Sequence, residues 1–194
     1  MGKFRKSEEL LYWRFFLLLY LAGFAAGILF VNLAWRYRTG DLDTLTLFTL
    51  QGSGTLRMEG YLWYLTKKRG GTLLVLHALG ITVLGKLAIA AGLLWSGFLG
   101  GTLAAIAVLQ LGAKGLAVLT AAAVPQIFVY LPAGLFYLTA VWRMSARSWA
   151  GEKLAAGTYR DYLMTSGAGL ALIFCGILLE CYVNPHVLEA VLGI

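Results

Sequence analysis

Long apolar runs separated by short basic segments are the main pattern along the chain. The first run covers residues 15–34 and follows a basic N-terminal segment, residues 1–14. A membrane-spanning helix needs about 20 mostly apolar residues, so this run predicts a span. The run is too long for the apolar region of a cleaved signal peptide, so we expect an uncleaved anchor with a cytoplasmic N-terminus.

The central region, residues 71–141, is apolar almost throughout and is broken only by glycines and single polar positions. Its length fits three spans joined by tight turns, and one more apolar run follows nearer the C-terminus. We predict these four spans at 71–92, 93–111, 115–141 and 165–183. The sequence therefore predicts an all-α polytopic membrane helical bundle with about five transmembrane helices, forming a single domain over residues 1–194.

The longest polar connection, residues 35–70, contains a short amphipathic pattern. Apolar residues recur there at helical spacing, at Met58, Tyr61, Leu62 and Leu65, and three basic residues follow them. Aromatic rings beside basic side chains are typical of a helix lying at the membrane surface. We expect an interfacial amphipathic helix, which either leads into the next span or recognises a partner.

Basic residues set the expected orientation and exclude some functions. Lys and Arg number 16 against 9 acidic residues, and 60% of the chain is hydrophobic with a mean hydropathy of +0.77. Segments 1–14 and 142–162 hold four basic residues each, and segment 184–194 holds none. Cytoplasmic loops are enriched in Lys and Arg, so we expect a multi-pass cell-membrane protein with an extracytoplasmic C-terminus. The excess of basic residues then indicates binding to the anionic headgroups of the lipid bilayer. We expect no binding to nucleic acid.

Catalytic and metal-binding motifs are missing from the sequence. His77 and His186 lie far apart, and Cys175 and Cys181 do not form a metal-binding or redox spacing. We therefore expect no enzyme, no catalytic residue, no metal and no cofactor. An intramembrane enzyme would require His77 and Glu180 to be adjacent.

Glu180 is the acidic residue of the last predicted span, near its outer end, and no basic residue follows it in the chain. A charge at the centre of a bilayer costs about 2.5–3.5 kcal/mol on insertion scales, so it is a functional candidate. Three interpretations stay open: a carboxylate at headgroup level, packing onto a polar group of another span, or contact with a partner. Pro185, five residues further on, is a candidate for the same partner contact.

Small residues and prolines predict how the helices pack. Glycine lets helix backbones approach closely in lipid, and Gly97 with Gly101 forms a GxxxG motif. This motif fits packing within the chain, a homo-oligomer or the docking of a partner. Pro125 and Pro132 predict a kinked or broken helix, a feature that also occurs in transporters. We assign helix-packing roles to Gly27, Asn32, Gly80, Gly85, Gly97, Gly101, Gly115, Pro125, Gln126 and Pro132.

Over nearly its whole length the chain resembles the stage II sporulation protein M family of small polytopic membrane proteins. The resemblance rests on the order and spacing of five segments: residues 27–32, 79–85, 97–101, 111–132 and 179–185. It implies a non-enzymatic scaffold in endospore formation. In that family the scaffold helps place the peptidoglycan-degrading stage II sporulation proteins D and P at the septum during engulfment of the forespore.

A permease-like component of a transport system is the alternative hypothesis. The proline-containing fourth span and the few polar residues inside the spans could line a path. The sequence has no cluster of intramembrane charges, which argues against a transporter that acts alone.

Overall fold

The computed structural model describes residues 2–35, 58–152, 155–183 and 186, and these residues are helical apart from short turns. The prediction of an all-α bundle is confirmed. Its elements are α1 (Gly2–Trp35), α3 (Met58–Leu65), the π-helix η1 (Thr66–Gly70), α4 (Gly71–Gly80), α5 (Gly85–Leu111), α6 (Ala113–Trp149) and α7 (Ala156–Tyr182).

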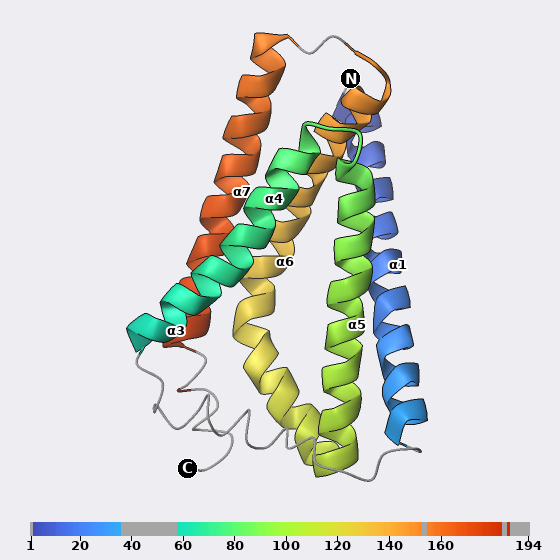
Figure 1. The fold of residues 1–194 in the computed structure, drawn as a ribbon, viewed down its shortest axis with the longest axis vertical. Coiled ribbons are helices and arrows are strands. Elements are labelled where there is room, and N and C mark those ends of the chain that lie inside the picture. The colour runs from blue at the N-terminus through green and yellow to red at the C-terminus, as the bar shows by residue number, and fades with distance from the viewer. Residues whose placement is uncertain (1, 36–57, 153–154, 184–185, 187–194) are drawn as a thin grey trace.

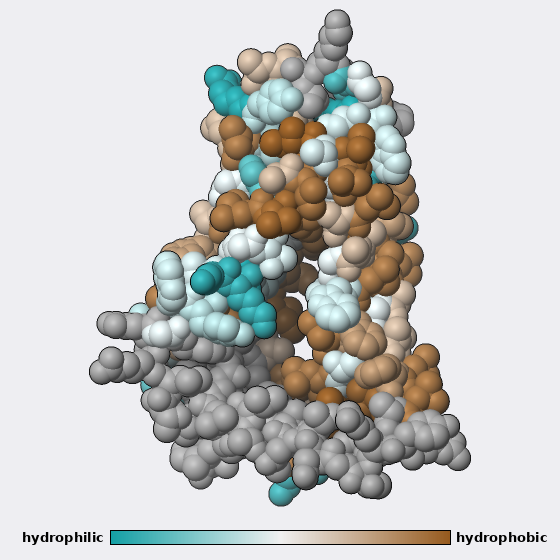
Figure 2. Space-filling model, in the orientation of Figure 1, coloured by the Kyte–Doolittle hydropathy of each residue, from teal (hydrophilic) through white to brown (hydrophobic). Residues whose placement is uncertain are grey.

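Four helices within the described residues are long and apolar enough to cross a membrane. They are Leu11–Leu33, Gly85–Leu111, Ile127–Trp149 and Ala156–Tyr182. Large apolar side chains on their surfaces are exposed, such as Leu18 at 66% and Leu29 at 63% on α1. Hydrophobic residues also cover much of the coloured part of the visible face (Figure 2). The protein is therefore a multi-pass membrane protein whose outer surface suits lipid, with four candidate spans against the predicted five.

The predicted spans 71–92 and 93–111 are wrong. A turn at residues 81–84 ends α4 at Gly80, and α5 then runs as one helix of 27 residues from Gly85 to Leu111. The turn residues are apolar except for Thr82, so the hydrophobic pattern does not show the break. The helices on either side approach closely at two glycines: a Cβ on Gly85 would lie 2.9 Å from the Cα of Gly80.

Two serines of α6 bind the backbone of this turn. The Ser145 hydroxyl donates to the carbonyl of Thr82 at 2.9 Å, and the Ser148 hydroxyl donates to the carbonyl of Ile81 at 2.7 Å. The backbone N–H of Lys86 in turn donates to Ser145 Oγ at 3.1 Å. Backbone groups of a turn in a membrane protein need such partners, because lipid supplies none. The turn therefore depends on side chains some 60 residues away in the sequence.

Ser145→Ala tests this dependence. Ser145 is fully buried, and its loss leaves the Thr82 carbonyl and the Lys86 N–H without their side-chain partner. An unsatisfied buried polar group costs about 1–3 kcal/mol. We therefore expect the free energy of unfolding in detergent micelles to fall by about 2 kcal/mol. Ser96→Ala is the matched control, because Ser96 is exposed and donates only to a carbonyl of its own helix. Equal stability of the two variants would contradict the proposed role of Ser145.

The predicted amphipathic helix is present as α3, and it continues through η1 into α4. Leu62 and Leu65 pack against Ile177 and Cys181 of α7, whereas Trp63 on the opposite side is 71% exposed. Together α3, η1 and α4 run obliquely across the bundle, from the C-terminal end of α7 to the turn that enters α5 (Figure 1). The apolar side of this helix is therefore covered by protein.

The ends of the helices divide into two groups (Figure 1). The start of α1, the turn into α5 and the connection from α6 to α7 lie at one end of the bundle. The end of α1, the start of α3, the turn from α5 to α6 and the end of α7 lie at the other. This alternation matches the expected placement of segments 1–14 and 142–162 on one side of a membrane.

Glycines bring α1 and α5 into backbone contact. A Cβ on Gly97 would overlap the carbonyl oxygen of Tyr20, and a Cβ on Gly101 would overlap that of Phe24. The arrangement is reciprocal, because Gly23 faces the carbonyl of Leu94 and Gly27 that of Phe98. The two helices are parallel, since residue numbers increase together along the contact. The GxxxG motif is thus occupied by α1 of the same chain, and a homo-oligomer would need another surface.

Candidate functional site

A partly buried ion pair joins η1 to α7. The Arg69 guanidinium contacts the Glu180 carboxylate twice, with 2.5 Å between Nη1 and Oε2 and 2.8 Å between Nη2 and Oε1. The Glu180 side chain is 7% exposed and that of Arg69 is 38% exposed. Two parallel contacts of this kind fix the orientation of both groups. Of the three interpretations of Glu180, the structure shows packing onto a polar group of another helix, and contact with a partner stays a prediction.

Tyr130 of α6 completes this cluster. Its hydroxyl donates to Glu180 Oε2 at 3.0 Å, and its ring lies under the guanidinium of Arg69, with 4.9 Å between Cζ and the ring centroid. A Cβ on Gly176 would lie 2.8 Å from the same ring, so α7 has room for Tyr130 only because position 176 is glycine. Three helical segments therefore meet at one charged cluster, which we call the Glu180 cluster (Arg69, Tyr130 and Glu180).

A second set of polar contacts holds α4 inside the bundle. The Tyr137 hydroxyl of α6 donates to the carbonyl of Leu73 at 2.6 Å, and the Tyr162 hydroxyl of α7 donates to the carbonyl of His77 at 2.7 Å. The rings of His77 and Tyr162 also stack, with centroids 4.7 Å apart. These hydroxyls would otherwise be unsatisfied in an apolar environment, so their bonds stabilise the position of α4.

His77 and Glu180 are not adjacent. His77 contacts Tyr162, which precedes Glu180 by 18 residues on the continuous helix α7. At about 1.5 Å per residue this separates the two positions by roughly 27 Å. The pairing that an intramembrane enzyme would need is therefore not formed. Within the described ranges, no group of three or more His, Cys, Asp or Glu residues is placed to hold a metal ion.

The remaining candidate residues have local roles. Gly80 faces the Tyr162 hydroxyl and Val141, and Gly115 faces the carbonyl of Ala107 across the turn between α5 and α6. Asn32 is exposed and donates to the carbonyl of Ile28 in its own helix, at 2.9 Å. Among the described residues no hydrogen bond joins Asn32 to another helix.

Of the kinked or broken helix predicted for the fourth span, the structure shows a bent helix without a break. Helix α6 is continuous from Ala113 to Trp149 through both Pro125 and Pro132, although it bends along its length (Figure 1). The bend accommodates the missing N–H donors without ending the helix, as prolines in membrane helices often do. The side-chain roles predicted for Pro125 and Gln126, and the partner contact predicted for Pro185, lie outside the described residues.

Sequence reasoning missed Arg69 and Tyr130. Arg69 belongs to the segment predicted as an external connection, and it precedes Glu180 by 111 residues. The sequence did contain a signal for this pair, because a carboxylate near the outer end of a span needs a cation on the same side of the membrane. The predicted topology places Lys67, Lys68 and Arg69 on that outer side. The glycine at position 176, four residues before Glu180, also marks the face that accepts a large side chain.

The fold and these contacts define a multi-pass helical membrane protein with an internal charged cluster. No family model, no curated protein and no solved structure matches this chain.

Proposed function

We propose that this chain is a non-enzymatic membrane scaffold. The observation that carries the proposal is that polar side chains of η1, α6 and α7 bind one another or the backbone of α4, although Nδ1 of His77 is buried with no hydrogen-bond partner among the described residues. Arg69, Tyr130 and Glu180 form one closed cluster, and the two buried tyrosines of α6 and α7 bind carbonyls of α4. A transport path or active site would present such groups to a ligand. Here they fix the relative positions of the helices.

The resemblance to the stage II sporulation protein M family supplies the specific form of the proposal. The scaffold acts in endospore formation, at the septum, and its partners are the wall-degrading stage II sporulation proteins D and P. The end of α1, the start of α3 and the end of α7 lie at the same end of the bundle (Figure 1). The connection between α1 and α3 and the segment after α7 lie almost entirely outside the described residues, but the helix ends that flank them share this end of the bundle. We therefore assign both segments to the partners, on the extracytoplasmic side.

A crosslinked pull-down from sporulating cells tests this proposal. We expect both wall-degrading partners to be recovered with the tagged full-length chain, and we expect deletion of the gene to block septal thinning or engulfment. The same pull-down from vegetative cells is the control. Normal engulfment after deletion, or recovery of neither partner, would contradict the sporulation function.

A permease-like component is the second candidate, and one observation favours it. The space-filling view shows a gap between α5 and the side of the bundle formed by α4 and α6 (Figure 2). Substrate-dependent flux into proteoliposomes containing the purified chain would support this function over the scaffold. Large apolar side chains of α6 are exposed, including Phe128 at 77% and Leu131 at 59%, which suits lipid better than a polar solute.

A further inference from the structure

The exposed side of α3 and η1 carries two aromatic and two basic residues. Trp63 and Tyr64 are 71% and 56% exposed, and Lys67 and Lys68, four positions further on, are exposed as well. Lys68 Nζ lies 5.6 Å from the centroid of the Tyr64 ring, so the lysines and the rings share one side of the helix. We call this surface the aromatic–lysine face (Trp63, Tyr64, Lys67 and Lys68). It is turned away from α7, against which Leu65 packs.

The aromatic–lysine face lies at the level of a membrane surface. Arg69, directly after the two lysines, binds Glu180, and Glu180 is two residues before the end of the candidate span Ala156–Tyr182. The lysines therefore lie level with the last turn of that span. Tryptophan, tyrosine and lysine at this level are typical of the headgroup region of a bilayer.

The same helix becomes apolar towards the middle of the bundle. Leu74 and Val75 of α4 are 62% and 61% exposed. The residue before them, Leu73, accepts a hydrogen bond from Tyr137, which lies midway along the candidate span Ile127–Trp149. Figure 2 shows the corresponding change from hydrophilic residues over η1 to hydrophobic residues over α4. A phospholipid needs both environments, because its phosphate lies at the membrane surface and its acyl chains fill the apolar interior.

The two lysines have charge available for a phosphate. Within the described ranges no ion pair or hydrogen bond engages the Lys67 ammonium. The Lys68 ammonium uses one of its three N–H donors on the Tyr64 hydroxyl, at 3.3 Å. The carboxylate of Glu180 is engaged in its own ion pair on the opposite side of the helix. Glu59, the acidic residue of α3, precedes Lys67 by more than two helical turns.

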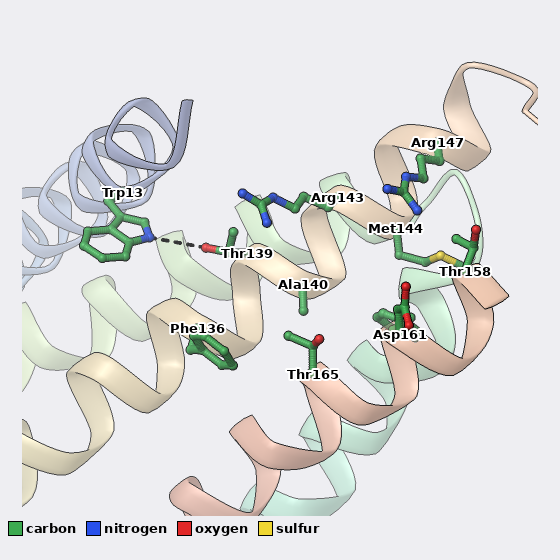
Figure 3. Close-up of a pocket in the computed structure, with 11 residues that line it drawn as sticks. Trp13, Phe136, Thr139, Ala140, Arg143, Met144, Arg147, Thr158, Asp161 and Thr165 are labelled. Atoms are coloured by element: carbon green, nitrogen blue, oxygen red, sulfur yellow. Dashed lines mark hydrogen bonds between the residues drawn. The ribbon is translucent and has the colours of Figure 1, made fainter. Parts of the chain in front are cut away.

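A pocket at the other end of the bundle has a different charge pattern. Arg147 of α6 and Asp161 of α7 both line it, so it holds charges of both signs (Figure 3). Thr139, which also lines the pocket, accepts a hydrogen bond from the indole of Trp13 at 3.3 Å. The charged side chains of the aromatic–lysine face are both positive, so this face is the one that suits an anion.

We propose that the aromatic–lysine face binds the headgroup of an anionic phospholipid in the adjacent leaflet. Lys67 and Lys68 bind the phosphate, since basic side chains at a membrane surface attract negatively charged headgroups. The two aromatic rings lie at the level of the glycerol, and an acyl chain runs along the exposed apolar residues of α4. A free amphipathic helix contacts the membrane with its apolar side. Here that side is bound to α7, so the basic side contacts the headgroup. This inference is independent of the proposed scaffold function.

Photocrosslinking of the full-length protein in liposomes tests the proposal. The liposomes contain phosphatidylcholine with a small amount of photoactivatable phosphatidylglycerol or, in a parallel sample, photoactivatable phosphatidylcholine. Mass spectrometry of the digested protein then measures the labelling of residues 63–75. We expect phosphatidylglycerol to label this segment in preference to phosphatidylcholine. Lys67→Gln and Lys68→Gln should each weaken labelling by phosphatidylglycerol about fivefold, which is the effect of one basic residue near an anionic membrane surface.

Lys114→Gln is the matched control. Lys114 is exposed at the start of α6, at the same end of the bundle, but it does not belong to the aromatic–lysine face. Its substitution makes the same change in net charge and should leave the labelling of residues 63–75 unchanged. Equal labelling by the two lipids would overturn the proposal, and so would full labelling by phosphatidylglycerol in the Lys67→Gln, Lys68→Gln double variant. If that double variant kept its lipid labelling and lost the wall-degrading proteins in the pull-down, the face would belong to a protein partner instead.

Discussion

Arg69→Leu is expected to lower the free energy of unfolding by about 3 kcal/mol. The substitution leaves the buried Glu180 carboxylate without its cation, and only the Tyr130 hydroxyl remains bonded to it. Removal of one partner of a buried ion pair costs about 3–5 kcal/mol. Arg69 keeps 38% of its side chain exposed, which places the expected cost at the lower end of this range. Unfolding of the purified protein by SDS titration in mixed micelles measures the effect.

The double variant Arg69→Leu with Glu180→Leu should recover most of the lost stability, because an apolar pair often replaces a buried ion pair at little cost. The two single variants, the double variant and the unmodified protein form a cycle that gives the coupling energy directly. Lys68→Leu is the control, since Lys68 is exposed and its side chain contacts Tyr64, one turn earlier in α3, rather than α7. Additive effects of the two single substitutions would contradict the importance of the pair.

The Glu180 cluster also connects stability to the proposed function. Arg69 and Leu65 fix the helix that starts at α3 onto α7, so they fix the end of the connection assigned to the partners. If that connection recruits the wall-degrading proteins, Arg69→Leu should reduce their recovery in the pull-down. The apolar double variant should restore it. Recovery of the wall-degrading proteins would then depend on the packing of the α3 helix against α7, and not on the charge of Arg69.

The outline of the bundle could be predicted from the sequence because its apolar runs are long and are separated by polar segments. The runs that became α1 and α7 needed no knowledge of their neighbours. The turn at residues 81–84 could not be found in this way, because its polar backbone groups are bound by Ser145 and Ser148 of a helix that comes later. A hydrophobic turn looks like a continuous span until these partners are known.

The candidate site was predictable only in part, for a similar reason. Glu180 could be singled out because a carboxylate inside an apolar run is costly. Its partner Arg69 could not be assigned, because nothing local distinguishes it from Lys67 and Lys68. The π-helix η1 carries Arg69 to Glu180 of α7, and π-helical segments often occur at functional sites. The sequence therefore identifies Glu180 as a residue that needs a partner, whereas the packing of the helices determines that the partner is Arg69.

Gly101→Val is expected to destabilise the protein by about 3 kcal/mol or to prevent α1 from packing on α5. Overpacking at a helix contact typically costs 1–3 kcal/mol, and the cost is greatest where the neighbour cannot move. The neighbour here is the backbone carbonyl of Phe24, which has no rotamer to change. Unfolding in micelles gives the loss of stability, and crosslinking between cysteines placed on α1 and α5 shows whether the two helices remain in contact.

Gly92→Val is the matched control, because a Cβ on Gly92 of the same helix meets no atom within 4 Å. It makes the same change in helix propensity without the clash, so its stability should stay near that of the unmodified protein.

The reciprocal geometry makes a further test available. Gly23 and Gly27 of α1 face carbonyls of α5, so a shift of α1 that relieves position 101 disturbs these contacts. Replacing Phe24 by a smaller residue should therefore not rescue Gly101→Val, since the obstacle is the carbonyl and not the ring. Rescue by Phe24→Ala would show that side chains, rather than the two backbones, set the spacing of α1 and α5.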